Sequence, residues 1–133
     1  MRNLLIAMVA AGVLAAVIFQ IGLDPRIAGM IAGTGFIIIG LLGVWIAWKR
    51  RFGGVAPLFV LVLSVIHVVG IAIPMVGFRI LNWSEPFAKV AVWGLDGPEF
   101  HALSTRFYGF WLFIVVFAWW MERKKDPEGS HSA

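Results

Sequence analysis

The sequence has 133 residues, of which 61% are hydrophobic and 14% are charged, and it contains no cysteine. A water-soluble domain of this length has about a quarter charged residues and recurring polar faces, so the composition excludes that class. The lack of cysteine excludes disulfides, thiolate metal ligands and thiol redox chemistry. The net charge of +4 comes from basic residues beside apolar runs, where membrane orientation explains them, so no nucleic-acid partner is expected.

Four apolar runs are long enough to cross a hydrocarbon core of about 30 Å, which takes roughly 20 helical residues. They predict membrane spans at about residues 4–22, 27–48, 55–78 and 104–121. Arg2 precedes the first run as in a signal peptide, but no polar cleavage region follows, so we expect this run to be retained. The sequence therefore predicts an all-α membrane protein with four transmembrane helices in an antiparallel bundle. Residues 1–125 are expected to form a single domain, and residues 126–133 are expected to form a polar, disordered tail.

The basic residues predict the orientation of these spans. If the N-terminus is cytoplasmic, seven basic residues face the cytoplasm and four lie outside, and this excess favours both termini in the cytoplasm. The seven are Arg2, Lys49, Arg50, Arg51, Arg123, Lys124 and Lys125, and the four are Arg26, Arg79, Lys89 and Arg106. Trp45, Trp48, Trp119 and Trp120 gather at the same inner interface, where indole rings are favoured. We expect a bacterial cytoplasmic (inner) membrane protein.

The first two spans are joined by the short turn "LDPR" at residues 23–26, so they are expected to form an antiparallel hairpin. Small residues recur on one face of each span, and "GMIAG" at 29–33 is a GxxxG motif. These helix-packing residues are Ala7, Ala11 and Ala15 on the first span and Gly29, Gly33, Gly40 and Gly43 on the second. Small side chains let helix backbones approach closely, so we expect this seam inside the hairpin, with an oligomer interface as the alternative.

The third span carries a histidine, His67, near the middle of the membrane. Counting 1.5 Å per helical residue places several other polar side chains at a similar depth. The predicted intramembrane polar site consists of Gln20, Thr34, Ser64, His67 and Tyr108. In addition, Pro74 has no N–H to donate to the carbonyl of Gly70, which leaves that acceptor free beside the same face.

Two roles are open for His67. A neutral imidazole has one donor and one acceptor, and partners at Ser64, Thr34 or Gln20 would make it a clamp between helices. Alternatively, an ionisable group inside the membrane marks an ion, proton or cofactor site. No cofactor is predicted. A haem b on His67 has little support, because His101 lies roughly 10 Å or more away in depth and does not match as a second axial ligand.

The long connection at residues 79–105 is expected to carry a short helix that lies on the outer membrane surface. Ser84 is placed to cap this helix, with Pro86 in its first turn. Trp83 and Trp93 would anchor it at the interface between lipid and water.

Polar residues gather at the outer surface around the start of the last helix. The sequence "DGPE" fits a capping box in which Asp96 caps the helix and Glu99 reaches back, so the helix is expected to begin near Pro98. The outer-surface polar site consists of Arg79, Glu85, Asp96, Glu99, His101 and Arg106. Such residues support acid–base chemistry, metal binding or contacts with lipid phosphate. However, residues 99 and 101 point about 200° apart on a helix, which favours caps and membrane-edge residues and no metal site.

Motifs of soluble enzymes, such as a phosphate-binding glycine loop, HExxH or GxSxG, are absent from the sequence. The sequence therefore favours a noncatalytic subunit or accessory factor of a larger membrane complex, which packs against other membrane-protein chains or against itself. One alternative is a small transporter or channel with a polar site around His67. Another is a membrane enzyme or lipid-binding protein that uses the outer loop around Glu99, His101 and Arg106.

Overall fold

The computed structural model of this chain describes residues 1–125, and the tail predicted at 126–133 lies outside the described residues. The described part is almost entirely helical and contains no named strand. Its elements are α1 (Arg2–Ile18), α2 (Pro25–Lys49), the 3-10 turn η1 (Arg51–Gly53), α3 (Val55–Ile66), the π-helical segment η2 (His67–Ala72), α4 (Ile73–Leu81), the 3-10 turn η3 (Phe87–Lys89) and α5 (Gly97–Lys125). The predicted all-α class is confirmed. Three units, namely α2, the continuous α3–α4 run (Val55–Leu81) and α5, have the length and apolar composition of membrane spans.

The first apolar run forms a shorter helix than the span predicted at residues 4–22. α1 ends at Ile18 and has 17 residues, fewer than any of the three spanning units. α1 ends early because α2 already begins at Pro25, and the chain must reverse its direction between the two helices. Asp24 caps α2, and its side chain accepts a hydrogen bond of 2.8 Å from the N–H of Arg26. The residues between the two helices are therefore needed to reverse the chain.

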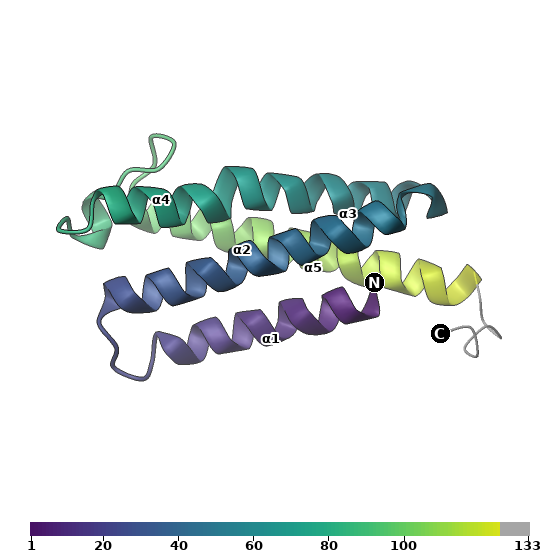
Figure 1. The fold of residues 1–133 in the computed structure, drawn as a ribbon, viewed down its shortest axis with the longest axis horizontal. Helices are drawn as coiled ribbons and strands as arrows, with labels where there is room; N and C mark the ends of the chain where they lie inside the picture. The colour runs from purple at the N-terminus through teal and green to yellow at the C-terminus, as the bar shows by residue number, and fades with distance from the viewer. Residues whose placement is uncertain (126–133) are drawn as a thin grey trace.

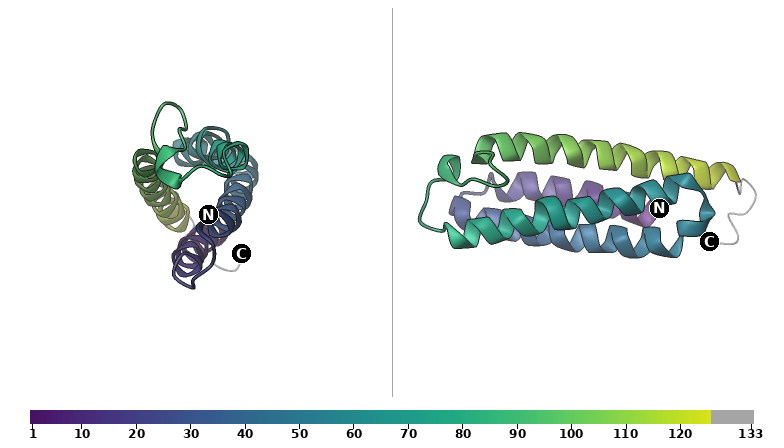
Figure 2. Two further views of the ribbon diagram at one scale, coloured as in Figure 1. Left: turned by 90° about the vertical axis from the view of Figure 1, so that its left-hand side faces the viewer. Right: turned by 90° about the horizontal axis from the view of Figure 1, so that it is seen from above.

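The helices lie side by side with their long axes roughly aligned (Figure 1). α2 contacts both α1 and the α3–α4 run, while α5 packs against α3 and α1. Seen from the end that carries the loop between α4 and α5, α1 lies at one edge of the molecule (Figure 2). The core lies where α1, α2, α3 and α5 meet, and its fully buried side chains include Leu4, Met8, Val60, Trp111 and Val115.

The small residues of α2 face the α3–α4 run, which differs from the seam predicted between the first two spans. Gly33, Gly40 and Gly43 are buried, and a Cβ atom at any of them would collide with a side chain of the α3–α4 run. Gly29 has open space in front of it. The predicted small residues of α1 are half-buried: Ala7, Ala11 and Ala15. The reason is the size of the side chains on the α3–α4 run. Bulky β-branched residues such as Val68 can pack against α2 only at positions where α2 has a glycine.

The α3–α4 run contains the π-helical segment η2, which ends two residues before Pro74. Pro74 has no N–H, so it does not donate to the carbonyl of Gly70. This carbonyl instead accepts a hydrogen bond of 2.8 Å from the indole N–H of Trp93, in the loop before α5. Trp93 and Gly94 both adopt positive φ, 54° and 78°, and form the tight turn that aims this indole. This hydrogen bond attaches the loop to the side of the α3–α4 run.

Replacing Trp93 with phenylalanine is expected to loosen the loop at residues 82–96 while the helices stay folded. Phenylalanine keeps an aromatic ring but has no N–H, so the hydrogen bond to the Gly70 carbonyl is lost at a cost of about 0.5–1.5 kcal/mol. Hydrogen–deuterium exchange of this loop should rise. Trp83→Phe is the control, because the Trp83 indole N–H has no hydrogen-bond partner within residues 1–125, and phenylalanine keeps an aromatic ring beside Arg26. Equal exchange in the two variants would contradict the role assigned to Trp93.

The surface helix predicted in the 79–105 connection is not formed as an α-helix. This connection instead contains the three-residue turn η3, which has no side-chain cap and follows Pro86 in an extended conformation with ψ of 148°. The chain then leaves the helical path because Val90 and Val92 turn inward and pack in a cluster with Phe100. Burial of these two valines outweighs the local helix signals.

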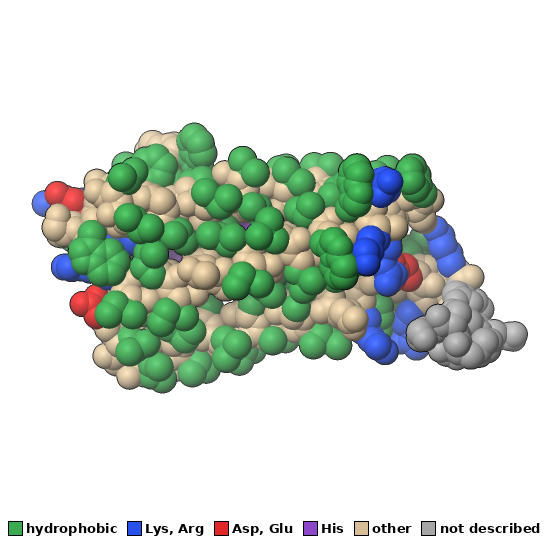
Figure 3. All heavy atoms as spheres, viewed as in Figure 1, with side chains coloured by type: hydrophobic (Ala, Val, Ile, Leu, Met, Phe, Trp, Pro, Cys, Tyr) green, Lys and Arg blue, Asp and Glu red, His purple; other side chains and the backbone are tan. Residues whose placement is uncertain are grey.

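α5 begins at Gly97 with both halves of the predicted capping box. The side chain of Asp96 accepts from the N–H of Glu99 at 2.9 Å, and the N–H of Asp96 donates to the carboxylate of Glu99 at 3.2 Å. A Cβ atom at Gly97 would overlap the carbonyl of Phe87, so glycine is required there. At the opposite end of the molecule, near the end of α5, lysine and arginine side chains gather (Figure 3).

Candidate functional site

His67, the first residue of η2, lies among aromatic side chains between α2 and α5 and is only 3% exposed. Its ring centroid lies 4.6 Å from that of Trp111 and 5.9 Å from that of Tyr108. The ring centroids of Phe36 and Phe107 lie 6.2 and 6.3 Å away. We call these five residues the His67 cage. Three of them come from one face of α5, because positions i, i+1 and i+4 lie close together on a helix.

One nitrogen of His67 has a defined partner. Nε2 lies 3.1 Å from the backbone carbonyl oxygen of Phe36 on α2. A carbonyl oxygen can only accept, so Nε2 carries the hydrogen and Nδ1 holds the free lone pair. Gly40 permits this approach, because a Cβ atom there would lie 3.0 Å from the His67 ring and still closer to Val68. The imidazole therefore joins the α3–α4 run to α2.

Two buried polar atoms of the His67 cage have no hydrogen-bond partner within the described residues. They are Nδ1 of His67, which is an acceptor, and Nε1–H of Trp111, which is a donor. Leaving a buried group unpaired costs about 1–3 kcal/mol, so folded proteins contain few such atoms. The two atoms are complementary in chemistry to a group that both donates and accepts, such as water or a hydroxyl.

Two further polar side chains, Tyr108 in the cage and Ser64 beside it, donate hydrogen bonds to backbone carbonyls. The hydroxyl of Tyr108 donates to the carbonyl of Met8 on α1 at 2.6 Å. Ser64 donates to the carbonyl of Val60, one turn earlier in its own helix, at 2.7 Å. Tyr108 therefore ties α5 to α1, as His67 ties the α3–α4 run to α2. The bonds of Tyr108 and His67 act as clamps between helices.

The structure places three of the five predicted intramembrane polar residues in or beside the cage: Ser64, His67 and Tyr108. The other two, Gln20 and Thr34, are exposed, and the Thr34 hydroxyl bonds to the carbonyl of Met30 in its own helix at 2.8 Å. The imidazole is not satisfied by Ser64, Thr34 or Gln20, which corrects that expectation. Its partner is the Phe36 carbonyl, because the close packing at α2 brings backbone oxygen within reach before any of these side chains.

Sequence reasoning missed Phe36, Phe107 and Trp111 as members of this site. A signal existed for α5, where three aromatic residues recur at helical spacing and at a depth similar to that of His67. No pattern marks Phe36, because it contributes a backbone carbonyl that any residue would supply.

The predicted outer-surface polar residues do not converge on one site. Arg79 donates to the backbone carbonyls of Glu85 and Trp83 at 3.0 and 3.3 Å, so it closes the loop and does not pair with a carboxylate. The two carboxylates of the capping box are engaged at the start of α5. His101 and Arg106 are exposed. Within residues 1–125, no three histidine or acidic side chains lie close enough to hold a metal ion.

A haem b at His67 gains no support from this geometry. The Nε2 atom is bonded to the Phe36 carbonyl, and aromatic rings pack around the imidazole. His101, the other histidine considered, is exposed near the start of α5.

No protein-family model, curated protein or solved structure matches the chain. Its function is therefore inferred from its residues and their contacts.

Proposed function

We propose that this chain is a noncatalytic subunit or accessory factor of a larger membrane complex. The observation that supports this function is the use of its intramembrane polar side chains. His67 and Tyr108 each donate to a backbone carbonyl of another helix, so they hold helices together. A protein built this way serves as a rigid partner for other membrane chains.

In this proposal α1 is a fourth span of an antiparallel bundle in the bacterial inner membrane. Its 17 residues reach about 26 Å at 1.5 Å per residue, close to the hydrocarbon thickness of roughly 30 Å. α1 packs along α2 and α5, which are both long enough to span. Four spans place the basic cluster around Lys49 and Arg123 on one side, which is the cytoplasmic side by the excess of positive charge.

α5 offers the surface that best fits a partner chain. It has the smallest buried share of the three spanning units. Its exposed face carries Phe110 and Phe113, and open space lies in front of Gly109. The two exposed rings can pack against the side chains of another transmembrane helix, and Gly109 lets the backbone of that helix approach closely.

Purification in mild detergent tests the subunit proposal. The chain, tagged and extracted from its native membrane, is expected to copurify with specific membrane proteins in fixed stoichiometry. A double variant, Phe110→Ala with Phe113→Ala, should lose these partners. The control is Ile38→Ala with Leu41→Ala, which truncates two exposed residues of α2 and should keep them. A wild-type chain that purifies as a stable monomer or homodimer would count against the proposal.

A second candidate function, a small transporter or channel, is favoured by the two unpaired atoms of the His67 cage. A transport path needs buried polar groups that are free to bind the passing ion or proton. Nδ1 of His67 and the indole N–H of Trp111 have this property within the described structure.

Two substitutions of His67 separate these functions. His67→Gln keeps an N–H that can donate to the Phe36 carbonyl but cannot titrate, whereas His67→Leu has neither property. A clamp predicts that His67→Gln keeps the wild-type stability and partners, and that His67→Leu loses about 1 kcal/mol, the size of an intramembrane hydrogen bond. A transport site predicts that both variants abolish proton or ion flux in liposomes. Flux that persists unchanged in both would exclude His67 from the path.

A further inference from the structure

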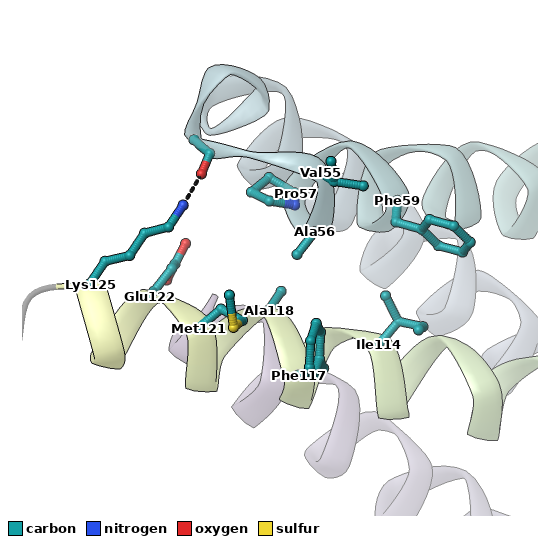
Figure 4. Close-up of a pocket in the computed structure, with 11 residues that line it drawn as sticks. Val55, Ala56, Pro57, Phe59, Ile114, Phe117, Ala118, Met121, Glu122 and Lys125 are labelled. Atoms are coloured by element: carbon teal, nitrogen blue, oxygen red, sulfur yellow. Dashed lines mark hydrogen bonds between the residues drawn. The ribbon is translucent and has the colours of Figure 1, made fainter.

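A crevice opens between the start of α3 and the last turns of α5, at the basic end of the molecule (Figure 4). It has a volume of about 370 Å³. It shares no residue with the His67 cage and lies near the opposite end from the outer loop. It is therefore a separate site, and neither of the functions proposed above names a ligand for it.

The walls of this crevice are apolar along most of its length. Pro57 and Phe59 of α3 lie across the gap from Ile114, Phe117 and Met121 of α5 (Figure 4). Both helices belong to units with the composition of membrane spans, so the crevice opens toward lipid. A narrow apolar gap in these surroundings fits a hydrocarbon chain and offers nothing to a polar solute.

The rim of the crevice carries a lysine that no carboxylate within residues 1–125 neutralises. The ammonium of Lys125 donates to the backbone carbonyl of Gly53. The acid at the rim is Glu122, and its carboxylate already accepts from Arg50 at 2.6 Å and from the ammonium of Met1 at 3.2 Å. Lys125 therefore keeps its positive charge available for an incoming anion.

Cation–indole pairs place this rim at the level of the lipid headgroups. Lys49 lies 3.8 Å from the ring centroid of Trp45, and Lys124 lies 4.6 Å from that of Trp120. Tryptophan and basic residues concentrate where the hydrocarbon meets the polar headgroups. The apolar part of the crevice thus lies at the depth of acyl chains, and its charged part lies at the depth of phosphates.

We infer that this crevice binds an anionic phospholipid. One acyl chain lies along the walls formed by α3 and α5, and the headgroup phosphate pairs with Lys125. A phosphate accepts strong, charge-assisted hydrogen bonds from an ammonium group. A zwitterionic lipid supplies the same chain, but its own cation competes with Lys125 for the phosphate, so the site distinguishes the two kinds of lipid.

Titration of the purified full-length protein with dioleoyl phosphatidylglycerol, followed by native mass spectrometry, tests this inference. Dioleoyl phosphatidylcholine has the same acyl chains and is the control lipid. The wild-type protein is expected to retain one phosphatidylglycerol more tightly than phosphatidylcholine. Lys125→Gln should weaken phosphatidylglycerol binding about fivefold, the contribution of one basic residue near an anionic headgroup. Lys124→Gln removes the same charge one residue away, outside the crevice, and should leave the affinity near that of the wild type.

Filling the crevice tests the part played by the acyl chain. Ala56→Phe is expected to abolish retention of phosphatidylglycerol, whereas Val62→Phe, on an exposed part of α3, should not. Met121→Trp fills the gap from the opposite wall and gives the same test if circular dichroism shows that Ala56→Phe is misfolded. Equal binding of the two lipids would overturn the inference. Equal effects of Lys125→Gln and Lys124→Gln, or full retention of lipid in the filled variants, would overturn it as well.

Discussion

Replacing Trp111 with alanine is expected to destabilise the protein by about 3 kcal/mol. Trp111 is fully buried in the core, where its ring lies against those of His67 and Tyr108. Truncation leaves a cavity that the helices fill only in part, at a cost of roughly 3–5 kcal/mol in water-soluble proteins. We expect the lower end because lipid is as apolar as the core, so packing is lost without a hydrophobic penalty. The free energy of unfolding, measured by reversible denaturation in mixed micelles, checks this value.

The matched control for this prediction is Trp120→Ala. Trp120 lies on the same helix but is 48% exposed, so its truncation creates no enclosed cavity and should cost less than about 1 kcal/mol. Trp111→Phe provides a second comparison, since it keeps an aromatic ring and removes the unpaired N–H. It should cost much less than Trp111→Ala. Equal losses at the two tryptophans would show that the core is not centred on Trp111.

Replacing Gly43 with alanine is expected to destabilise the protein by about 1–3 kcal/mol, the usual cost of overpacking. A Cβ atom at this position would lie 2.6 Å from Oγ of Ser64 and 2.9 Å from Cζ2 of Trp111. Both of these side chains are fully buried, so neither can move aside without disturbing its neighbours. The added methyl group therefore forces α2 and the α3–α4 run apart. Thermal unfolding in detergent should show the loss.

Gly35→Ala is the control for this substitution because it makes the same chemical change on the same helix. Nothing lies within 4 Å of a Cβ atom at Gly35, so alanine meets no neighbour there. It should be neutral or stabilising by up to about 1 kcal/mol, since alanine is the better helix former. A loss in Gly35→Ala as large as that in Gly43→Ala would mean that helix propensity, and not the contact with α3–α4, decides the result.

Features that depend on residues close in sequence could be predicted without the fold. The apolar runs define the long helical units, because each run of about 20 residues can satisfy its own backbone hydrogen bonds by forming a helix. The capping box of Asp96 and Glu99 involves residues three apart, and it forms as predicted. The freed carbonyl of Gly70 also follows from local chemistry, since Pro74 has no N–H to offer.

Local signals failed where burial competed with them. The 79–105 connection carries the signature of a short helix, yet only the turn η3 forms between α4 and α5, because Val90 and Val92 gain more by packing inside. Trp93 was expected to anchor the loop at the membrane surface. In the structure its indole N–H donates a hydrogen bond to the carbonyl of Gly70, 23 residues earlier in the chain. Neither the burial of the two valines nor the hydrogen bond of Trp93 can be predicted from the residues next to them in the sequence.

The sequence by itself determined where the long apolar helices lie and which of their residues share a face. Only the tertiary structure decided what each face meets: the glycines of α2 meet the α3–α4 run, His67 meets the Phe36 carbonyl, and Lys125 meets the Gly53 carbonyl. Helical periodicity depends on neighbours along one chain segment, whereas the partner of a face depends on how all the segments pack together. A backbone carbonyl that serves as the partner leaves no mark in the sequence, because every residue has one.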